Sequence, residues 1–188
     1  MTEHAAGGED DELQAENLLG ALCLAVDDRM QDGVTEAAGQ AASAGVALSA
    51  LHHFLDAPTV DLVRQVLGLT HSGTVRLVDR LAAAGYVRRG PAADGRATTV
   101  SLTAAGRRAA ARVTARRQAV LHHALSVLSP TERNRFGELA GRVLAGMIRP
   151  AGATRWMCRL CDTGACGREE GRCPVATAAG YEPDVSGS

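Results

Sequence analysis

The sequence contains no lysine, so each of its 20 permanently cationic side chains is an arginine. Aromatic residues are also scarce, at 3% of the chain, although hydrophobic residues make up 46%. A core with so few aromatic rings must consist of Ala, Leu and Val side chains. Because strands prefer β-branched and aromatic residues, this composition favours closely packed helices over a β-sandwich.

Long apolar runs are absent as well. No stretch of about 18 uninterrupted apolar residues occurs, so we expect nothing to span a membrane. The acidic N-terminal segment lacks the basic-then-apolar pattern of an export signal. Together these absences predict a cytoplasmic protein.

The short motifs of common enzyme classes are missing too. The sequence has no glycine-rich phosphate loop, no Gly-x-Ser-x-Gly and no His-Glu-x-x-His. It also shows no paired carboxylates in a setting that would tune their pKa values. We therefore expect no catalytic residues and no enzymatic activity.

The formal net charge of −1 hides a strong segregation of charge. Residues 1–12 are acidic and contain no arginine, whereas residues 58–117 carry eleven arginines against three aspartates, a local balance of +8. A surplus of this size is typical of a surface that binds a polyanion such as nucleic acid. A solvated helical face is the simpler alternative.

Helices are predicted on both sides of residues 58–103 of this basic region. Residues 1–12 have no apolar period, so we expect a disordered acidic tail. Apolar spacing predicts two helices before the basic region, over 13–30 and 35–55, with Gly45 as a candidate break in the second. Two further helices are expected after it, over 104–128 and 130–148.

The basic region itself begins with a helix-turn-helix pattern. A short helix over 59–67, with Thr59 as its N-cap, is followed by a tight turn at Gly68. A longer helix over 72–84 comes next, and Gly85 ends it. The second helix has a predicted inward stripe of Thr74, Leu77, Val78 and Leu81.

The other face of this second helix carries the groups that could read DNA. Arginine binds guanine or phosphate, serine can contact either, and a small apolar side chain can meet a thymine methyl. An ordinary surface stripe is the alternative. The residues on this face are His71, Ser72, Val75, Arg76, Asp79 and Arg80.

Two β-prone segments, 86–89 and 97–102, flank an Asp-Gly turn and predict a hairpin beside that helix. At its tip, Arg96 could enter the narrow minor groove while Asp94 holds the guanidinium in place. At its base, Arg88 and Arg89 are expected to contact phosphates. The fold class is therefore mainly α with a small β-hairpin wing, a winged helix-turn-helix.

Residues 68–107, above all the wing segment that begins Asp94-Gly95-Arg96, resemble the MarR family of bacterial transcriptional regulators. The resemblance implies a repressor or activator whose reading helix spans 72–84 and whose wing arginine is Arg96. It also implies a homodimer that binds double-stranded DNA at an inverted-repeat operator. Small-molecule effectors are expected between the dimerisation helices and the DNA-binding lobe.

The flanking helices support a dimer independently, because they exceed what one small DNA-binding lobe needs and their apolar faces require a partner. We therefore expect five parts along the chain. They are an acidic tail (1–12), N-terminal helices for dimerisation and support (13–57), a DNA-binding lobe (58–103), C-terminal dimerisation helices (104–149) and a cysteine-rich segment, expected to bind a metal, with a tail (150–188).

Four of the five cysteines lie close together, with the spacing Cys-x2-Cys-x4-Cys-x6-Cys-Pro. A reducing cytoplasm disfavours a disulfide framework, and four thiolates in one glycine-rich loop can enclose a metal centre. Four tetrahedral thiolates suit zinc, whereas a compact loop ending in Cys-Pro is also typical of iron–sulfur sites. Reversible thiol chemistry without a metal stays open. The four candidate ligands are Cys158, Cys161, Cys166 and Cys173.

Two expectations concern isolated residues. Cys23 follows the apolar line of the first helix, so we expect a buried structural thiol. Two adjacent histidine pairs, at 52–53 and 122–123, are expected at the helix surface, although one member of each could line an effector pocket.

Two rival functions remain at this point. The chain could be a metal- or iron–sulfur-containing redox protein that uses the winged helix as a scaffold, or it could be a protein-interaction module. The local balance of +8 and the Asp94–Arg96 wing favour DNA binding over both.

Overall fold

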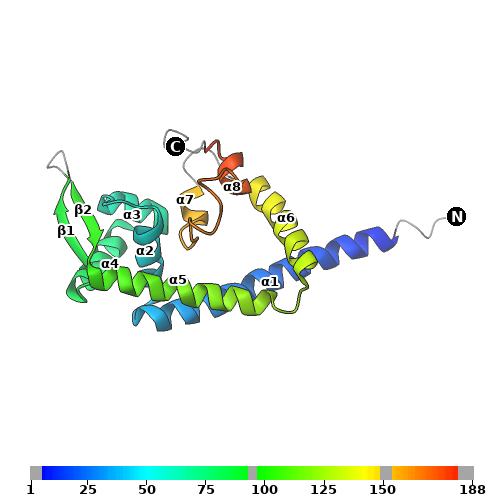
Figure 1. Ribbon diagram of the computed structural model, residues 1–188, viewed down its shortest axis with the longest axis horizontal. Coiled ribbons are helices and arrows are strands. Elements are labelled where there is room, and N and C mark those ends of the chain that lie inside the picture. Colours follow the sequence, from blue (N-terminus) through cyan, green and yellow to red (C-terminus); the bar gives the residue numbers. More distant parts are fainter. Residues whose placement is uncertain (1–5, 93–96, 149–153, 182–188) are drawn as a thin grey trace.

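The computed structural model describes residues 6–92, 97–148 and 154–181 (Figure 1). Within them the chain is mainly helical with one two-stranded antiparallel hairpin, so the predicted fold class is confirmed. The elements are α1 (Ala6–Ala38), α2 (Ala42–His53), α3 (Val60–Leu67), α4 (His71–Ala83), β1 (Val87–Pro91), β2 (Thr98–Leu102), α5 (Ala104–Leu125), α6 (Pro130–Gly146), α7 (Thr154–Met157) and α8 (Pro174–Ala178).

The core lies where α2 packs against the C-terminal half of α1, the first turns of α5, and the lobe formed by α3, α4 and the hairpin. Small residues dominate it, including Ala38, Ala47 and Ala109, which are almost fully buried. Alanine lets helices approach closely, which is how a chain with few aromatic rings fills its interior. Gly45 continues this logic, because a Cβ there would overlap the Val34 side chain on α1. It therefore marks a close helix contact and is not the break that we expected.

Helix starts follow local capping chemistry. The Thr103 side chain accepts a hydrogen bond from the backbone N–H of Gly106 and begins α5. Ser129 and Glu132 form a reciprocal capping box at α6, where Pro130 occupies the first turn. Each arrangement satisfies backbone donors that the first helical turn leaves unpaired.

The N-terminal helices differ from the expected boundaries. Helix α1 starts at Ala6, inside the segment expected to be disordered, and continues to Ala38. Its acidic residues stabilise a helix when they lie near its positive N-terminal end, so composition alone misjudged this part. The break before α2 falls at residues 39–41, where Gly39 adopts a positive φ of 61°. Cys23 lies on the protruding half of α1 and is exposed in this single chain, so the expectation of a buried thiol is wrong for it.

Two elements leave the core with apolar side chains uncovered. The N-terminal half of α1 projects beyond the rest of the molecule, and α6 rises away from α5 (Figure 1). Leu18 and Leu24 on α1 are 63% and 70% exposed. On α6 the exposed apolar residues include Phe136, Leu139, Val143 and Leu144. In the part of the chain that the structure describes, no helix combines the length and apolarity needed to cross a membrane.

Candidate nucleic-acid interface

Helices α3 and α4 are joined by a turn of three residues whose geometry follows from its sequence. Gly68 ends α3 in the left-handed region, at φ 64°, which glycine adopts without strain. Thr70 then begins α4 by accepting a hydrogen bond of 3.1 Å from the backbone N–H of Gly73. Helix α4 thus starts one residue earlier than predicted, because Thr70 is the cap.

The two faces of α4 separate as the spacing predicted. The inward stripe of Thr74, Leu77, Val78 and Leu81 is buried. On the opposite face Val75 is half-buried between its neighbours. The predicted DNA-contacting residues His71, Ser72, Arg76 and Arg80 are all exposed, as is Asp79.

The hairpin lies beside α4 and is held by a third stretch of backbone. Strands β1 and β2 pair antiparallel, with Arg89 opposite Val100. The backbone N–H of Val100 also donates to the carbonyl of Pro58 at 2.9 Å, and Thr59 forms a β-bridge with Thr99. The start of α3 therefore fixes the direction in which the hairpin projects.

One ion pair connects the hairpin directly to α4. Arg89 Nη2 lies 2.8 Å from Asp79 Oδ1, so these two predicted surface groups engage each other. The partnership was missed in the sequence, where Asp79 stands only as an acidic residue between arginines. We assign Asp79 a positioning role, because its carboxylate holds the Arg89 guanidinium next to the exposed face of α4.

The two arginines of β1 do not act together. Neighbouring residues of a strand point to opposite faces, and Arg88 accordingly lines a different cavity, of about 270 Å³, with His52, Asp56 and Arg107. The structure therefore brings Arg89, but not Arg88, to the α4 side of the hairpin. The wing-tip residues Asp94 and Arg96 lie outside the described residues. The last described contact before the tip is the bond from the Ala92 N–H to the Ala97 carbonyl, at 2.8 Å.

Several arginines of the basic region are already paired. Arg64 binds Asp61 at 2.7 Å, and this hydrogen bond holds the pKa of the Asp61 carboxyl below its usual value. Arg116 binds Glu36 on α1 at 3.0 Å. Arg76 and Arg80, by contrast, have no ion-pair partner among the described residues. These two guanidinium groups remain available to an external anion.

Comparison with known proteins agrees with this geometry. Residues 42–97 match the model of the MarR family. The chain has the winged-helix fold of that family. MepR, a transcription regulator of the Staphylococcus aureus multidrug efflux pump MepA, is similar at 17% identity, a TM-score of 0.61 and coverage of 71% of this chain and 98% of MepR. Wild-type Escherichia coli MarR in its apo form is 25% identical, with a TM-score of 0.54 and coverage of 67% of this chain and 96% of MarR.

A third solved structure is a mutant MepR from S. aureus bound to an oligodeoxyribonucleotide. It is 18% identical to this chain, with a TM-score of 0.53 and coverage of 71% of this chain and 98% of its own. No curated protein sequence matches the chain. Since nearly all of each of these solved structures is covered, the remainder of this chain lies outside the fold that they share with it.

The cysteine-rich segment of this MarR-like chain packs between α6 and the DNA-binding lobe. Figure 1 shows α7 and the following loop between α2 and α6. Helix α8 contacts α6, where buried Gly141 leaves no room for a Cβ beside Pro174, and α7 contacts α3. Thr163 donates a hydrogen bond of 2.9 Å to the carbonyl of His53 at the end of α2.

His53 is the centre of this contact and corrects our expectation of a surface position. Its side chain is 10% exposed, with Nε2 2.8 Å from Thr114 Oγ1 on α5 and Nδ1 3.7 Å from Asp162 Oδ1. Burial lowers the pKa of His53, and the nearby Asp162 only partly opposes this shift. Gln118 of α5 also donates to Asp162, at 2.9 Å. The segment therefore ties the end of α2 to α5.

All four predicted metal ligands line one largely apolar cavity of about 410 Å³. Contact with the Cys158 thiol lowers the pKa of Cys161 to about 6, burial opposes this, and Arg117 and Arg168 favour the thiolate. The same contact and burial raise the pKa of Cys158, and burial raises that of Cys166. Among the described residues, no three His, Cys, Asp or Glu side chains are arranged around a common point as metal ligands.

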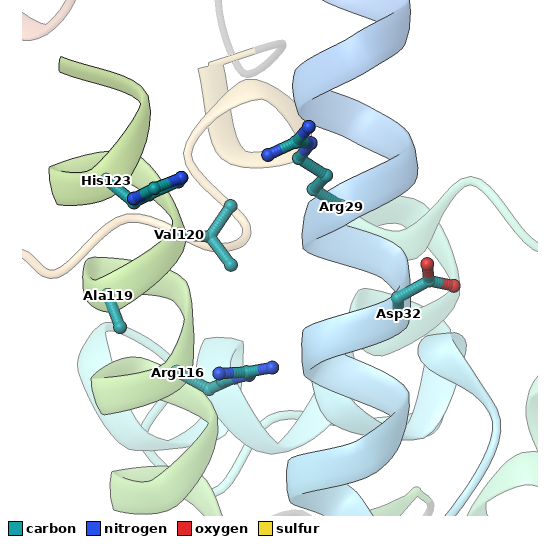
Figure 2. Close-up of a pocket in the computed structure, with 6 residues that line it drawn as sticks. All are labelled: Arg29, Asp32, Arg116, Ala119, Val120 and His123. Carbon is teal, nitrogen blue, oxygen red and sulfur yellow. The ribbon is translucent and has the colours of Figure 1, made fainter. Parts of the chain in front are cut away.

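Another cavity, of about 330 Å³, lies between α1 and α5 and is lined by both charged and apolar side chains. Figure 2 shows the Arg29, Arg116 and His123 side chains directed into the space between the two helices, with Val120 among them. Asp32 lines the same cavity but points away from α5 (Figure 2). Arg116 is already paired with Glu36, so Arg29 is the guanidinium group of this cavity that has no ion-pair partner among the described residues.

Proposed function

We propose that this chain is a sequence-specific DNA-binding transcriptional regulator of the MarR type, with no catalytic role. The observation that carries the proposal is the exposed face of α4, where Arg76 and Arg80 have no ion-pair partner among the described residues. That MepR has been crystallised with an oligodeoxyribonucleotide supports it. The expected cytoplasmic location goes with a function on promoter DNA.

In the proposed mechanism α4 enters the major groove. Arg76 and Arg80 are four residues apart, so they lie on one side of the helix, about 6 Å apart along its axis. That spacing lets one guanidinium bind a guanine edge while the other binds a base or a phosphate. Arg89, held by Asp79, sits where it can bind the adjacent phosphate backbone. The wing, with Arg96 and Asp94, is assigned to the minor groove.

The regulator acts as a homodimer in this proposal. The uncovered apolar residues of α1 and α6 supply a surface that one chain cannot bury. A twofold dimer presents the same stripe from each copy and sets two α4 helices one DNA turn apart, which matches an inverted-repeat operator.

Replacing either α4 arginine should weaken DNA binding. We expect Arg76→Ala and Arg80→Ala each to lower affinity by roughly 10- to 100-fold, equivalent to about 1–3 kcal/mol. The measurement is fluorescence anisotropy on a duplex selected by the wild-type chain from a randomised pool. A variant that loses a base contact will also bind a wider range of sequences at that position of the duplex. A variant that loses a phosphate contact will instead reduce the slope of log affinity against log salt concentration by about one unit.

Arg135→Ala is the matched control, because it removes one exposed arginine from α6, outside the proposed interface. Unchanged affinity in both α4 variants would show that this face does not read DNA. If the wild-type chain selects no duplex and instead retains a protein partner independently of salt, the interaction-module function replaces this one.

We also infer that the regulator responds to a small organic anion bound between α1 and α5, because Arg29 lines that cavity and has no ion-pair partner among the described residues. Thermal shift with a panel of aliphatic and aromatic carboxylates tests the inference. The control is Arg142→Ala, which removes an exposed arginine of α6 that does not line this cavity. We expect the carboxylate to raise the Tm equally for the wild-type chain and Arg142→Ala, and less for Arg29→Ala. An equal rise in all three proteins would place the anion elsewhere, and no rise with any carboxylate would remove this class of effector.

A further inference from the structure

The strongest unexplained feature is the cavity around the four clustered cysteines. Cys158 follows α7 directly, Cys173 is the N-cap of α8, and Cys161 and Cys166 lie on the loop between these helices. All four are free thiols. All four side chains line the same cavity. A short loop that turns four thiols toward one space is unusual for side chains that only fill a core.

Two arginines at the same cavity each have a buried nitrogen without a hydrogen-bond partner, and one of them, Arg168, also stacks over the Tyr181 ring. The Nε atoms of Arg117 and Arg168 are buried and have no hydrogen-bond partner in the described chain. Both residues line the cavity, Arg117 from α5 and Arg168 from the loop. A buried donor without a partner carries a desolvation cost, which is larger in a charged group. Filling the cavity with an apolar group would leave that cost in place.

A thiolate-ligated metal meets both requirements. A divalent cation held by four thiolates keeps a net charge of about −2, and iron–sulfur clusters held by four thiolates are also anionic. Two neighbouring guanidinium groups offset such a charge and can donate hydrogen bonds to sulfur. The volume of about 410 Å³ leaves room for the thiols to turn toward a common centre.

We propose that Cys158, Cys161, Cys166 and Cys173 bind a metal centre as four thiolate ligands, with Arg117 and Arg168 as its charge partners. The centre also stabilises the contact of the loop with the DNA-binding lobe. Thr163, which bonds to the end of α2, and Asp162, which bonds to Gln118 within α5, lie between the second and third ligands. Loss of the metal therefore loosens the contacts that the loop makes with His53 and Gln118, while α2 and α5 still pack directly on each other.

The metal is tested first on the intact chain, purified without oxygen. We expect about one zinc per chain, or iron and sulfide with visible absorbance, since these are the two centres that four thiolates hold. Either result supports the site and identifies its metal. Cys161→Ser and Cys166→Ser should lose most of it, whereas Cys23→Ser, which removes the exposed thiol of α1, should keep it all.

Arg168→Gln keeps every thiol and covers the case in which a cysteine variant fails to fold. We expect its affinity for the metal, measured by competition with a chromophoric chelator, to be roughly tenfold lower than that of the wild-type chain. This is the usual effect of losing a side chain that contacts the ligands of a metal site. A wild-type chain that holds no metal as purified, and takes up neither zinc nor iron with sulfide under reducing conditions, overturns the proposal. So does full metal content in both Cys161→Ser and Cys166→Ser.

The link to the lobe rests on the proposed DNA-binding function and is measured separately. Removal of the metal should change affinity for the selected duplex by about tenfold, a typical coupling between two sites in one protein. Equal affinity of metal-loaded and metal-free chains would refute the link while leaving the metal site established. Absence of DNA binding in both forms would contradict the proposed function and not the metal site.

Discussion

Replacing Gly106 with alanine should destabilise the chain by about 3 kcal/mol, the upper part of the usual range for an overpacked interior. A Cβ at this position would overlap the backbone carbonyl of Tyr86, which cannot rotate aside as a flexible side chain could. That carbonyl already accepts a hydrogen bond of 2.9 Å from the Thr103 N–H. The Thr103 hydroxyl in turn donates to Gly85 and caps α5. One methyl group would therefore disturb the junction of hairpin and α5.

The measurement is thermal unfolding followed by circular dichroism, where this cost corresponds to a Tm lowered by roughly 6–12 °C for a chain of this size. Gly137→Ala is the matched control, because it adds the same methyl to a helix where no atom lies within 4 Å. That variant should be slightly stabilised, by about 0.5–1 kcal/mol, since alanine is the better helix former. Equal Tm values for the two variants would mean that α5 and Tyr86 are not in contact as described.

The DNA-binding lobe was predictable because its determinants are local. Thr59 and Gly68 lie within one turn of the helix ends that they set, and the buried stripe of α4 follows from helical spacing alone. The Asp-Gly turn indicated the hairpin in the same way. Each of these signals acts within a few residues, so no knowledge of distant contacts was needed.

Features that depend on distant contacts were not predictable. His53 is enclosed by Thr114 of α5 and by a loop more than a hundred residues later in the chain. Gly45 was expected to break a helix, but its role comes from Val34 on another helix. The pairing of Asp79 with Arg89 depends on how the hairpin leans on α4. Arg117 and the clustered cysteines line one cavity only in the folded chain, so this proximity also could not be predicted from local sequence.

The α6 stripe yields the largest expected effect on DNA binding. Leu139 and Val143 are 43% and 48% exposed, one turn apart on the same side of the helix. In a twofold dimer these side chains would be buried against the same α6 surface of the second chain. A glutamate at either position would place a charge in an apolar interface, and because both chains carry the substitution the cost of burying the charge is incurred twice.

Leu139→Glu with Val143→Glu should therefore convert the dimer to a monomer, measured by light scattering after size exclusion. Affinity for the selected duplex should fall by at least about 100-fold, because a monomer binds one half-site and loses the gain from linking two. Asn134→Glu is the control, since it adds a charge to an exposed position on the far side of α6 from Phe136. A double variant that stays dimeric would show that α6 is not part of the dimer interface. A monomeric variant that binds the full operator as tightly as the wild-type chain would show that DNA binding does not need the dimer.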